Sequence, residues 1–270
     1  MSKILSLALV TTLAATAISQ DPDKEGPRYA IVDHMQLIEG VSDEEYIAFE
    51  KLHQRLHQNR VDGGAMRAWH MGKVENHNHA QFATMRLFDS LSQYEQRLPR
   101  SAWKVNFTPE EREKMWSHGK VRRMVASELW RIHSTALRRE KPETKDDNNA
   151  PYVRVDYIKA APGKRWDYFQ MEEKLFQRIH QARIDAGEMT AWMFFSREFP
   201  GGDDNEWDYA TINVYPTAEA ARTRSSVSRR DVLTDEEMES FPDVGSLRKI
   251  VRYELWHPQL RTKPADRKQN

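Results

Sequence analysis

Two glutamates at matching positions are the strongest candidates for chemistry in this chain. Glu128 and Glu254 each open the tripeptide Glu-Leu-Trp near the end of a run of β-forming residues. A carboxylate on a buried strand face is costly unless it is paired, and Arg86 or Arg252 could supply the cation. Apolar rings around such a carboxyl would raise its pKa and suit it to act as a general base or proton donor. The alternative is a structural ion pair in each copy.

A polar network is the second candidate. Asp33 and Asp156 each lie within a short β-forming run, where aspartate is disfavoured, so its recurrence asks for a reason. Each either bonds a neighbouring element or lines a pocket, and the alternation of this strand does not settle which face it occupies. His57 and His180 share one helical position beside an apolar stripe. They are either catalytic or heme-ligating residues, or hydrogen-bonded residues at the edge of the core.

No metal site is predicted. His53 and His57 have the i, i+4 spacing of metal ligands, but Phe176 replaces His53 in the second copy. The chain also lacks cysteine, which excludes disulfides, iron–sulfur clusters and cysteine nucleophiles.

These residues recur because the sequence contains an internal repeat. Residues 33–69 align without a gap on residues 156–192, and by our count 15 of the 37 pairs are identical. The best stretch pairs 50–62 with 173–185, and Glu128-Leu129-Trp130 pairs with Glu254-Leu255-Trp256. The two copies are too long for solenoid units and indicate two duplicated domains.

Each copy has the same predicted order of elements. Alternating runs predict strands at 31–38 and 152–160, and helical spacing with a capping box at Ser42 and Glu45 predicts a helix over 42–61. A hairpin, short helices and a last strand ending at Trp130 or Trp256 follow. The order β-α-β-β-α-β predicts an α+β fold of two tandem ferredoxin-like repeats. Each sheet would carry helices on one face only, so the second copy is expected to bury the other face. The predicted domains, in chain order, are a signal peptide (1–19), the first repeat (28–133), a charged linker (134–150), the second repeat (151–258) and a polar tail (259–270).

On this element order and duplication, the chain resembles the dimeric α/β-barrel superfamily, in which two ferredoxin-like units close their sheets into a barrel. The resemblance implies that the two repeats form an intramolecular pseudo-dimeric α/β barrel. That superfamily includes antibiotic-biosynthesis-type monooxygenases, heme-degrading monooxygenases, and the NIPSNAP-like and EthD-like groups. The resemblance implies cofactor-free oxygenation or heme degradation as chemistry. Heme degraders of this kind combine a polar amide on the first strand, a Trp and a helix His, whereas the first strand here offers Asp33 and Asp156. No cofactor is therefore predicted, with heme as the alternative.

Strand alternation predicts which side chains line the interior of the barrel. The aliphatic set Ala83, Met85 and Leu87 is expected to meet the helices, and the aromatic and polar set to point inward. The predicted interior is a small-molecule pocket. Its ligand-binding candidates are Trp69, Trp192, Arg86, Asn213, Trp130, Trp256, Tyr209, Thr84 and Thr211.

Composition and the N-terminus narrow the setting. Lys plus Arg equals Asp plus Glu at 41 each, so no global basic field for nucleic acid is present. Residues 1–19 combine Lys3, a short apolar run and small residues at a cleavage spacing, which predicts export to the periplasm or outside the cell. We therefore expect an exported monomer or homodimer that binds or transforms a small aromatic or apolar molecule. The alternatives are a packed, non-catalytic interaction protein and a heme-binding or monooxygenase-type enzyme.

Overall fold

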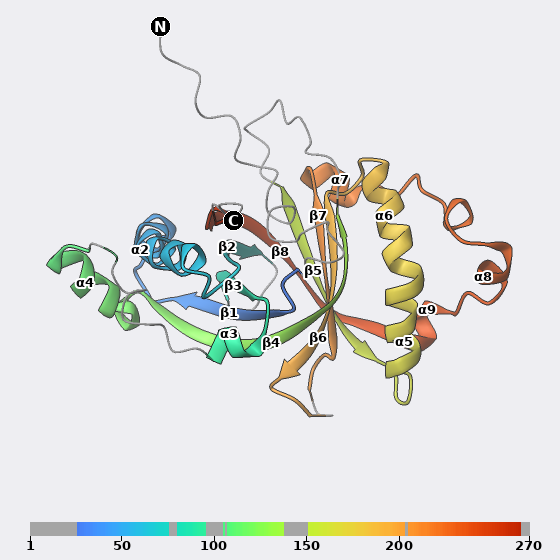
Figure 1. Ribbon diagram of the computed structural model, residues 1–270, viewed down its shortest axis with the longest axis horizontal. Coiled ribbons are helices and arrows are strands. Elements are labelled where there is room, and N and C mark those ends of the chain that lie inside the picture. Colours follow the sequence, from blue (N-terminus) through green and yellow to red (C-terminus); the bar gives the residue numbers. More distant parts are fainter. Residues whose placement is uncertain are drawn as a thin grey trace, which may run out of the picture. The chain divides into compact units, whose positions relative to one another are not determined.

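The computed structural model describes residues 26–75, 80–95, 105, 107–137, 151–202 and 205–265 (Figure 1). The predicted signal peptide, residues 138–150 of the predicted linker and residues 266–270 of the predicted tail lie outside these ranges. No helix among the described residues is long and apolar enough to span a membrane.

Eight strands form an antiparallel barrel. Their hydrogen-bonded order is β1-β3-β2-β8-β5-β7-β6-β4, and this order closes on itself. The fold is therefore α+β with an eight-stranded barrel, as predicted. The described residues divide into two compact units, an N-terminal unit within 26–131 and 256–265 and a C-terminal unit within 132–255.

The N-terminal unit packs one long helix on its strands. The helix, α2, begins after the predicted capping box, in which Ser42 accepts from the backbone of Glu45 and Glu45 accepts from that of Ser42. Its buried residues Tyr46 and Phe49 pack on the strands, whereas Leu52 and Leu56 pack with Phe107 and with Met115 of α4. The elements are β1 (Tyr29–Leu37), α2 (Asp43–Asp62), β2 (Ala68–Glu75), β3 (Phe82–Phe88), α3 (Leu91–Glu95), α4 (Pro109–Trp116), η2 (His118–Lys120) and the first part of β4 (Arg122–Leu137).

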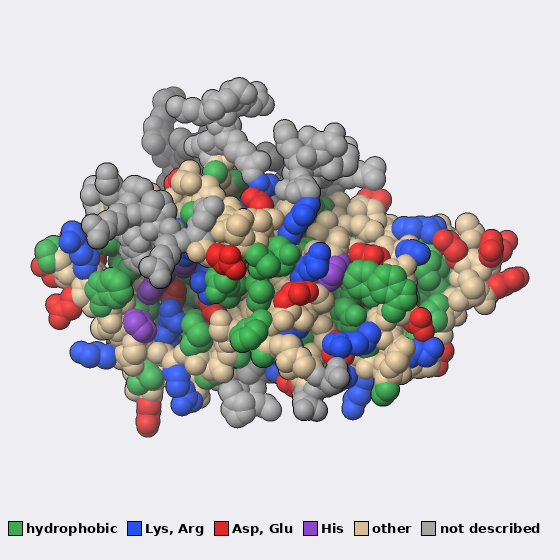
Figure 2. Space-filling model, turned by 60° about the horizontal axis from the view of Figure 1, so that its bottom comes forward, with side chains coloured by type: hydrophobic (Ala, Val, Ile, Leu, Met, Phe, Trp, Pro, Cys, Tyr) green, Lys and Arg blue, Asp and Glu red, His purple; other side chains and the backbone are tan. Residues whose placement is uncertain are grey.

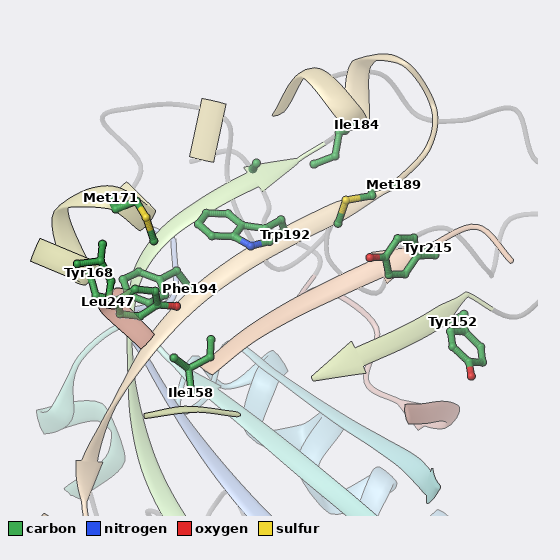
Figure 3. Packing of buried hydrophobic residues seen from close by; sticks show 11 residues of the cluster. Tyr152, Ile158, Tyr168, Met171, Ile184, Met189, Trp192, Phe194, Tyr215 and Leu247 are labelled. Carbon is green, nitrogen blue, oxygen red and sulfur yellow. The ribbon is translucent and has the colours of Figure 1, made fainter. Parts of the chain in front are cut away.

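The C-terminal unit repeats this order. Its elements are β5 (Tyr152–Ala160), α5 (Arg165–Met171), the π-helical turn η3 (Glu172–Phe176), α6 (Gln177–Asp185), β6 (Ala191–Phe199), β7 (Tyr209–Tyr215), α7 (Ala218–Arg222), η4 (Arg229–Asp231), α8 (Asp235–Glu239), α9 (Val244–Leu247) and most of β8 (Arg248–Arg261). Trp192 and Phe194 of β6 pack with Tyr168 and Met171 of α5 and with Leu247 in its core (Figure 3).

The two long helices differ by one residue, which corrects the ungapped alignment. The helix over 165–185 has 21 residues, whereas α2 has 20, and the loop before it (161–164) is one residue shorter than 38–42. The extra residue is accommodated in the π-helical turn, the usual way in which an α-helix absorbs an insertion. Before this turn the equivalent residues are 122 apart, so Glu50 corresponds to buried Glu172 and not to Glu173.

The predicted facing of the second and third strands is wrong. Tyr46 of α2 packs on Phe82 at a ring-centroid distance of 4.6 Å, and His57 of α2 stacks on Trp69 at 5.1 Å. The aromatic and polar set therefore faces the helix, and Ala83, Met85 and Leu87 take the opposite, inner face. In the C-terminal unit, Trp192, Tyr209, Thr211 and Asn213 also lie on the helix face, by the same alternation and registers. Glu128, Trp130, Glu254 and Trp256 lie on the inner face, as predicted.

The last strand of each repeat is longer than predicted. β4 continues to Leu137, into the predicted linker, and β8 continues to Arg261, into the predicted tail.

On the face shown in Figure 2, Lys and Arg side chains are interspersed with Asp and Glu. This mixture fits the zero net formal charge.

Candidate functional site

A buried charged cluster lies between α2 and the sheet of the N-terminal unit. Glu50 is 2% exposed, and its Oε1 lies 2.9 Å from Nε of Arg122, the first residue of β4. Fully buried Tyr46, one turn before Glu50, lies close enough that the carboxylate charge raises the pKa of its hydroxyl further. Nδ1 of His53 lies 3.6 Å from Oε2 of Glu50. These residues come from one helix face and one strand end.

The C-terminal unit contains the same three residue types in the same places. The hydroxyl of Tyr168 donates a 2.7 Å hydrogen bond to Oε1 of Glu172. The guanidinium of Arg248, the first residue of β8, lies 5.9 Å from the centroid of the Tyr168 ring. Tyr46, Glu50 and Arg122 thus correspond to Tyr168, Glu172 and Arg248, and we call these two sets the Tyr–Glu–Arg clusters.

An aspartate with its own arginine borders each cluster. In the N-terminal unit, Asp33 accepts from Arg86 at 2.6 Å and from the hydroxyl of Ser127 at 2.6 Å. Asp33 therefore lies on the helix face of β1, which the alternation of this strand in the sequence did not settle. The carboxyl is 4% exposed, but Ser127 is exposed, so the cluster can be reached along β4.

The arginine that pairs with the aspartate has changed strands in the second unit. Asp156 accepts from Nε of Arg154 at 2.8 Å and from the amide of Asn213 at 3.2 Å. Arg154 lies opposite Asn213 in the register of β5 and β7, just as Ile31 lies opposite Arg86 in that of β1 and β3. The arginine thus lies on the neighbouring strand β3 in the N-terminal unit and on the aspartate's own strand β5 in the C-terminal unit. In both units the aspartate has a guanidinium partner.

A histidine covers a tryptophan in each unit. His57 stacks on Trp69 with ring centroids 5.1 Å apart, and His180 stacks on Trp192 at 5.0 Å. Burial and the neighbouring arginines hold the pKa of His57 well below its usual range, and burial lowers the pKa of His180 to about 3. Both imidazoles are therefore neutral near pH 7.

Burial also shifts the acids of the clusters. Desolvation raises the pKa of Glu50 against the opposing effect of Arg122, and it raises the pKa of Glu172 to about 7. Glu172 therefore exchanges a proton near neutral pH, next to a tyrosine hydroxyl that can donate to the carboxylate. A carboxyl with such a pKa is suited to general acid or base catalysis.

The predicted site residues separate into two groups. Those on the helix face, beside the clusters, are Asp33, His57, Trp69, Thr84 and Arg86 in the N-terminal unit and Asp156, His180, Trp192, Tyr209, Thr211 and Asn213 in the C-terminal unit. On the inner face, Trp130 donates to Glu128 at 3.1 Å, and Tyr157 donates to Glu254 at 2.9 Å. Arg252 lies 3.4 Å from Glu254, which confirms that predicted pairing, whereas Arg86 pairs with Asp33 instead.

Sequence reasoning missed the Tyr–Glu–Arg clusters themselves. Tyr46 with Glu50 and Tyr168 with Glu172 share an i, i+4 spacing, which an alignment with one gap would have brought into register. Arg122 was not detectable from strand alternation, because the pairing of β1 with β4 shifts between His34 and Met35. This irregularity brings Arg122 opposite Leu37 and onto the helix face.

Heme is the cofactor that the resemblance raised, and the layer between α2 and the sheet does not fit it. A site for a bare metal ion is a separate matter: among the described residues there is no group of three His, Cys, Asp or Glu side chains that could hold one. A heme between α2 and the sheet would need a planar slot, but the Tyr46–Phe82 and His57–Trp69 ring contacts close this layer. The residues as arranged there do not fit that group.

The fold is similar to solved structures of low sequence identity. A protein of Lactobacillus acidophilus NCFM named as a "putative monooxygenase" has a TM-score of 0.52 and 10% identity, over 88% of this chain and 97% of that one. A heme-binding protein of Thermus thermophilus has a TM-score of 0.47 and 10% identity, over 86% and 91%. Chlorite dismutase of Candidatus Nitrospira defluvii has a TM-score of 0.44 and 11% identity, over 86% and 91%.

These likenesses concern the fold. The likeness with a TM-score of 0.52 shows the dimeric α/β-barrel fold that the resemblance implied. No family model matches the chain, and no curated protein matches it by sequence.

Proposed function

We propose that the chain binds a small, weakly polar or aromatic molecule beside the Tyr–Glu–Arg clusters and transfers a proton to or from it. The observation that supports this most is that both units place a buried glutamate against a tyrosine and an arginine. In the C-terminal unit Tyr168 and Glu172 lie as far from the start of their helix as Tyr46 and Glu50 do in α2, although the preceding loop is shorter. The π-helical turn that begins at Glu172 then brings the following residues back into register with α2.

Stability alone does not explain the clusters. Buried ion pairs cost desolvation free energy, and apolar residues of similar size often stabilise a fold as well or better. A glutamate that is 2% exposed and titrates near pH 7 is a burden on the fold and a useful group for proton transfer. Two buried glutamates with raised pKa values at equivalent places favour a role in chemistry.

The molecule would reach each cluster along the last strand of the repeat. Met124 and Ser127 are exposed on β4, and Ile250 and Tyr253 are 39% and 45% exposed on β8. Tyr253 also carries the guanidinium of Arg154 above its ring at 5.0 Å. An aromatic ligand fits this mixture of apolar surface and charged groups.

The fold adds a candidate reaction. The structure with a TM-score of 0.52 bears the name of a monooxygenase, and removal of a proton from a bound phenol or enol is a first step that cofactor-free oxygenation requires. In this proposal Glu172 or Glu50 accepts that proton, and the arginine of the same cluster stabilises the resulting anion. The non-catalytic alternative would leave the clusters with a packing role only.

Native mass spectrometry tests the proposal. The chain would be purified from an exporting host as wild type, as the double variant Glu50→Gln and Glu172→Gln, and as the control Glu173→Gln, which changes the half-buried neighbour. We expect a retained mass, or quenching of Trp69 and Trp192 fluorescence by added phenols, in the wild type and the control but not in the double variant. Equal binding by all three would contradict the proposal.

The inner face needs its own variant. If Glu128→Gln with Glu254→Gln abolished binding while the cluster variant retained it, the ligand would lie on the inner face, where the sequence had placed it. A bare polypeptide mass together with no response to any phenol would favour the non-catalytic interaction protein.

We also propose export and cleavage of the N-terminal segment, with a monomer or homodimer as the mature form. The intact mass of the protein recovered from the medium or periplasm tests the first point, and light scattering tests the second. Recovery of the full-length mass from the cytoplasm alone would contradict export.

A further inference from the structure

One arginine in the last turn of each long helix has opposite surroundings in the two units. Arg183 of α6 donates from Nε to Oε2 of Glu188 at 3.1 Å. Glu188 also accepts from the hydroxyls of Ser225 and Ser226 at 2.6 and 2.7 Å, and these bonds lower its pKa to about 2. The C-terminal unit therefore neutralises this guanidinium with a carboxylate of its own.

The equivalent residue in the N-terminal unit is Arg60, and its partners have been replaced. The turn is the same in both units, because Ala65 N donates to Arg60 O at 2.9 Å and Glu188 N donates to Arg183 O at 2.9 Å. Ala65 thus stands where Glu188 stands. Phe88 stands where Tyr215 lies, and the Tyr215 hydroxyl also bonds Arg183.

Among the described residues, no carboxylate pairs with Arg60. Its Nε is buried and has no hydrogen-bond partner there, and the charged group that acts on its pKa is another cation, Arg86. Burial and Arg86 lower the pKa of Arg60 to about 10. Among the described residues, the nearby carboxylates already have partners, since Asp33 pairs with Arg86 and Glu50 pairs with Arg122.

We infer that Arg60 binds the carboxylate of a small organic ligand, in the place that the Glu188 side chain fills in the other unit. Arg60 is partly buried, and its buried Nε lacks the hydrogen bond that water would otherwise supply. A carboxylate is the group whose planar geometry matches a guanidinium. The inference rests on the proposed function for the location of the ligand, and it adds that the ligand is a carboxylate and that only the N-terminal unit binds this group.

The tests use benzoate and benzamide, which have nearly the same shape but differ in charge. We expect the wild type to bind benzoate at least about 10-fold more tightly than benzamide, as loss of a charge-assisted hydrogen bond predicts. Arg60→Gln should remove this preference. Arg183→Gln, the matched change in the other unit, should leave it intact. Calorimetry or tryptophan fluorescence would report both affinities.

Ala65→Glu gives a second test of the inference, in a variant that is expected to fold at least as stably as the wild type. It installs the carboxylate found in the C-terminal unit, so it should raise the melting temperature without ligand and abolish the preference for benzoate. Equal affinities for the two probes, or a benzoate preference that survives in both Arg60→Gln and Ala65→Glu, would overturn the inference.

The same measurements separate this inference from the proposed function. Equal binding of both probes overturns the carboxylate site and leaves the proposed function standing. An Arg60-dependent preference that is unaffected by Glu50→Gln with Glu172→Gln supports the carboxylate site and overturns the proposed role of the clusters. Binding of neither probe overturns the carboxylate site, and the response to phenols then decides the proposed function.

Discussion

At the scale of the residue, Glu172 makes the stability of the C-terminal unit depend on pH. Its pKa of about 7 lies above its usual value of 4.5, so the folded state holds the proton more tightly than the unfolded chain. This contribution to stability is fully present below pH 4.5 and is lost as the pH rises through 7. The free energy of unfolding should therefore fall over this window by up to about 1.4 kcal/mol per pH unit.

Urea unfolding of wild type and Glu172→Gln at several pH values would measure this slope. The histidines act in the opposite direction, because the lowered pKa values of His57 and His180 remove stability as the pH falls below about 6.5. Only the difference between wild type and Glu172→Gln isolates the glutamate. Identical slopes for these two proteins would contradict the prediction, and Glu173→Gln should behave as the wild type.

The displaced arginine beside the aspartate gives a second prediction. Arg86→Asn should destabilise the N-terminal unit by about 2–4 kcal/mol, because it leaves the buried Asp33 carboxylate without its cation. Adding Ile31→Arg recreates the arrangement of Arg154 and Asn213 and should recover a large part of the loss. A double-mutant cycle by thermal unfolding measures the recovery; strictly additive losses would show that the two strands are not interchangeable here.

The repeat explains which of these residues the sequence could reveal. Asp33, Asp156, His57 and His180 are identical at a constant offset, so an ungapped comparison finds them. Glu50 and Glu172 fall out of register between a shortened loop and a π-helical turn, and neither feature has a sequence signature of its own. Sequence reasoning therefore identified the residues around the clusters and missed the acids at their centres.

At the scale of the element, the π-helical turn η3 is expected to hold Tyr168 and Glu172 in place. Deleting Glu173 would make the helix regular, and its two parts would then have to rotate by about 100° relative to each other. Tyr168 and Glu172 should leave Arg248, and the pH dependence that Glu172 contributes should disappear.

A compensating insertion makes this prediction specific. Deletion of Glu173 together with one added residue in the loop 161–164 recreates the loop and helix lengths of the N-terminal unit, so it should restore both stability and pH dependence. Urea unfolding at pH 5 and pH 8 measures both. If the deletion alone already behaved as the wild type, the turn would have no part in positioning the glutamate.

The strands show why the sequence predicted the order of elements but not their facing. In β3 every residue except Arg86 is buried, with Phe82 and Phe88 on the helix face and Ala83 and Leu87 on the inner face. When both faces of a strand are buried, alternation of apolar with polar residues no longer marks the core side. The choice between aromatic and aliphatic faces then depends on which helix side chains they meet, here Tyr46 and His57.

At the scale of the whole molecule, the compact units do not coincide with the two halves of the chain. Residues 256–265 form the end of the second repeat and the segment after it in the sequence, but they belong to the N-terminal unit. There Trp69 N donates to the Thr262 hydroxyl at 2.9 Å, and Thr262 N donates to Trp69 O at 2.9 Å. Trp256 packs so closely on Gly72 that a Cβ atom added to this glycine would lie 3.3 Å from the Cβ of Trp256. The duplication was visible in the sequence, but this exchange of strand ends was not.

The N-terminal half alone should therefore be less stable than the same half with residues 256–265 attached. Residues 26–150 lack the segment that bonds both backbone groups of Trp69, so we expect a lower melting temperature and a more exposed Trp69 than in the same piece with 256–265 attached by a Gly-Ser linker. Thr262→Val in the attached segment should cancel part of the gain, because it removes the acceptor for Trp69 N while the shape of the side chain is kept. Equal melting temperatures with and without the segment would show that the N-terminal half is complete as a folding unit, and that the two backbone bonds to Thr262 contribute nothing measurable to it.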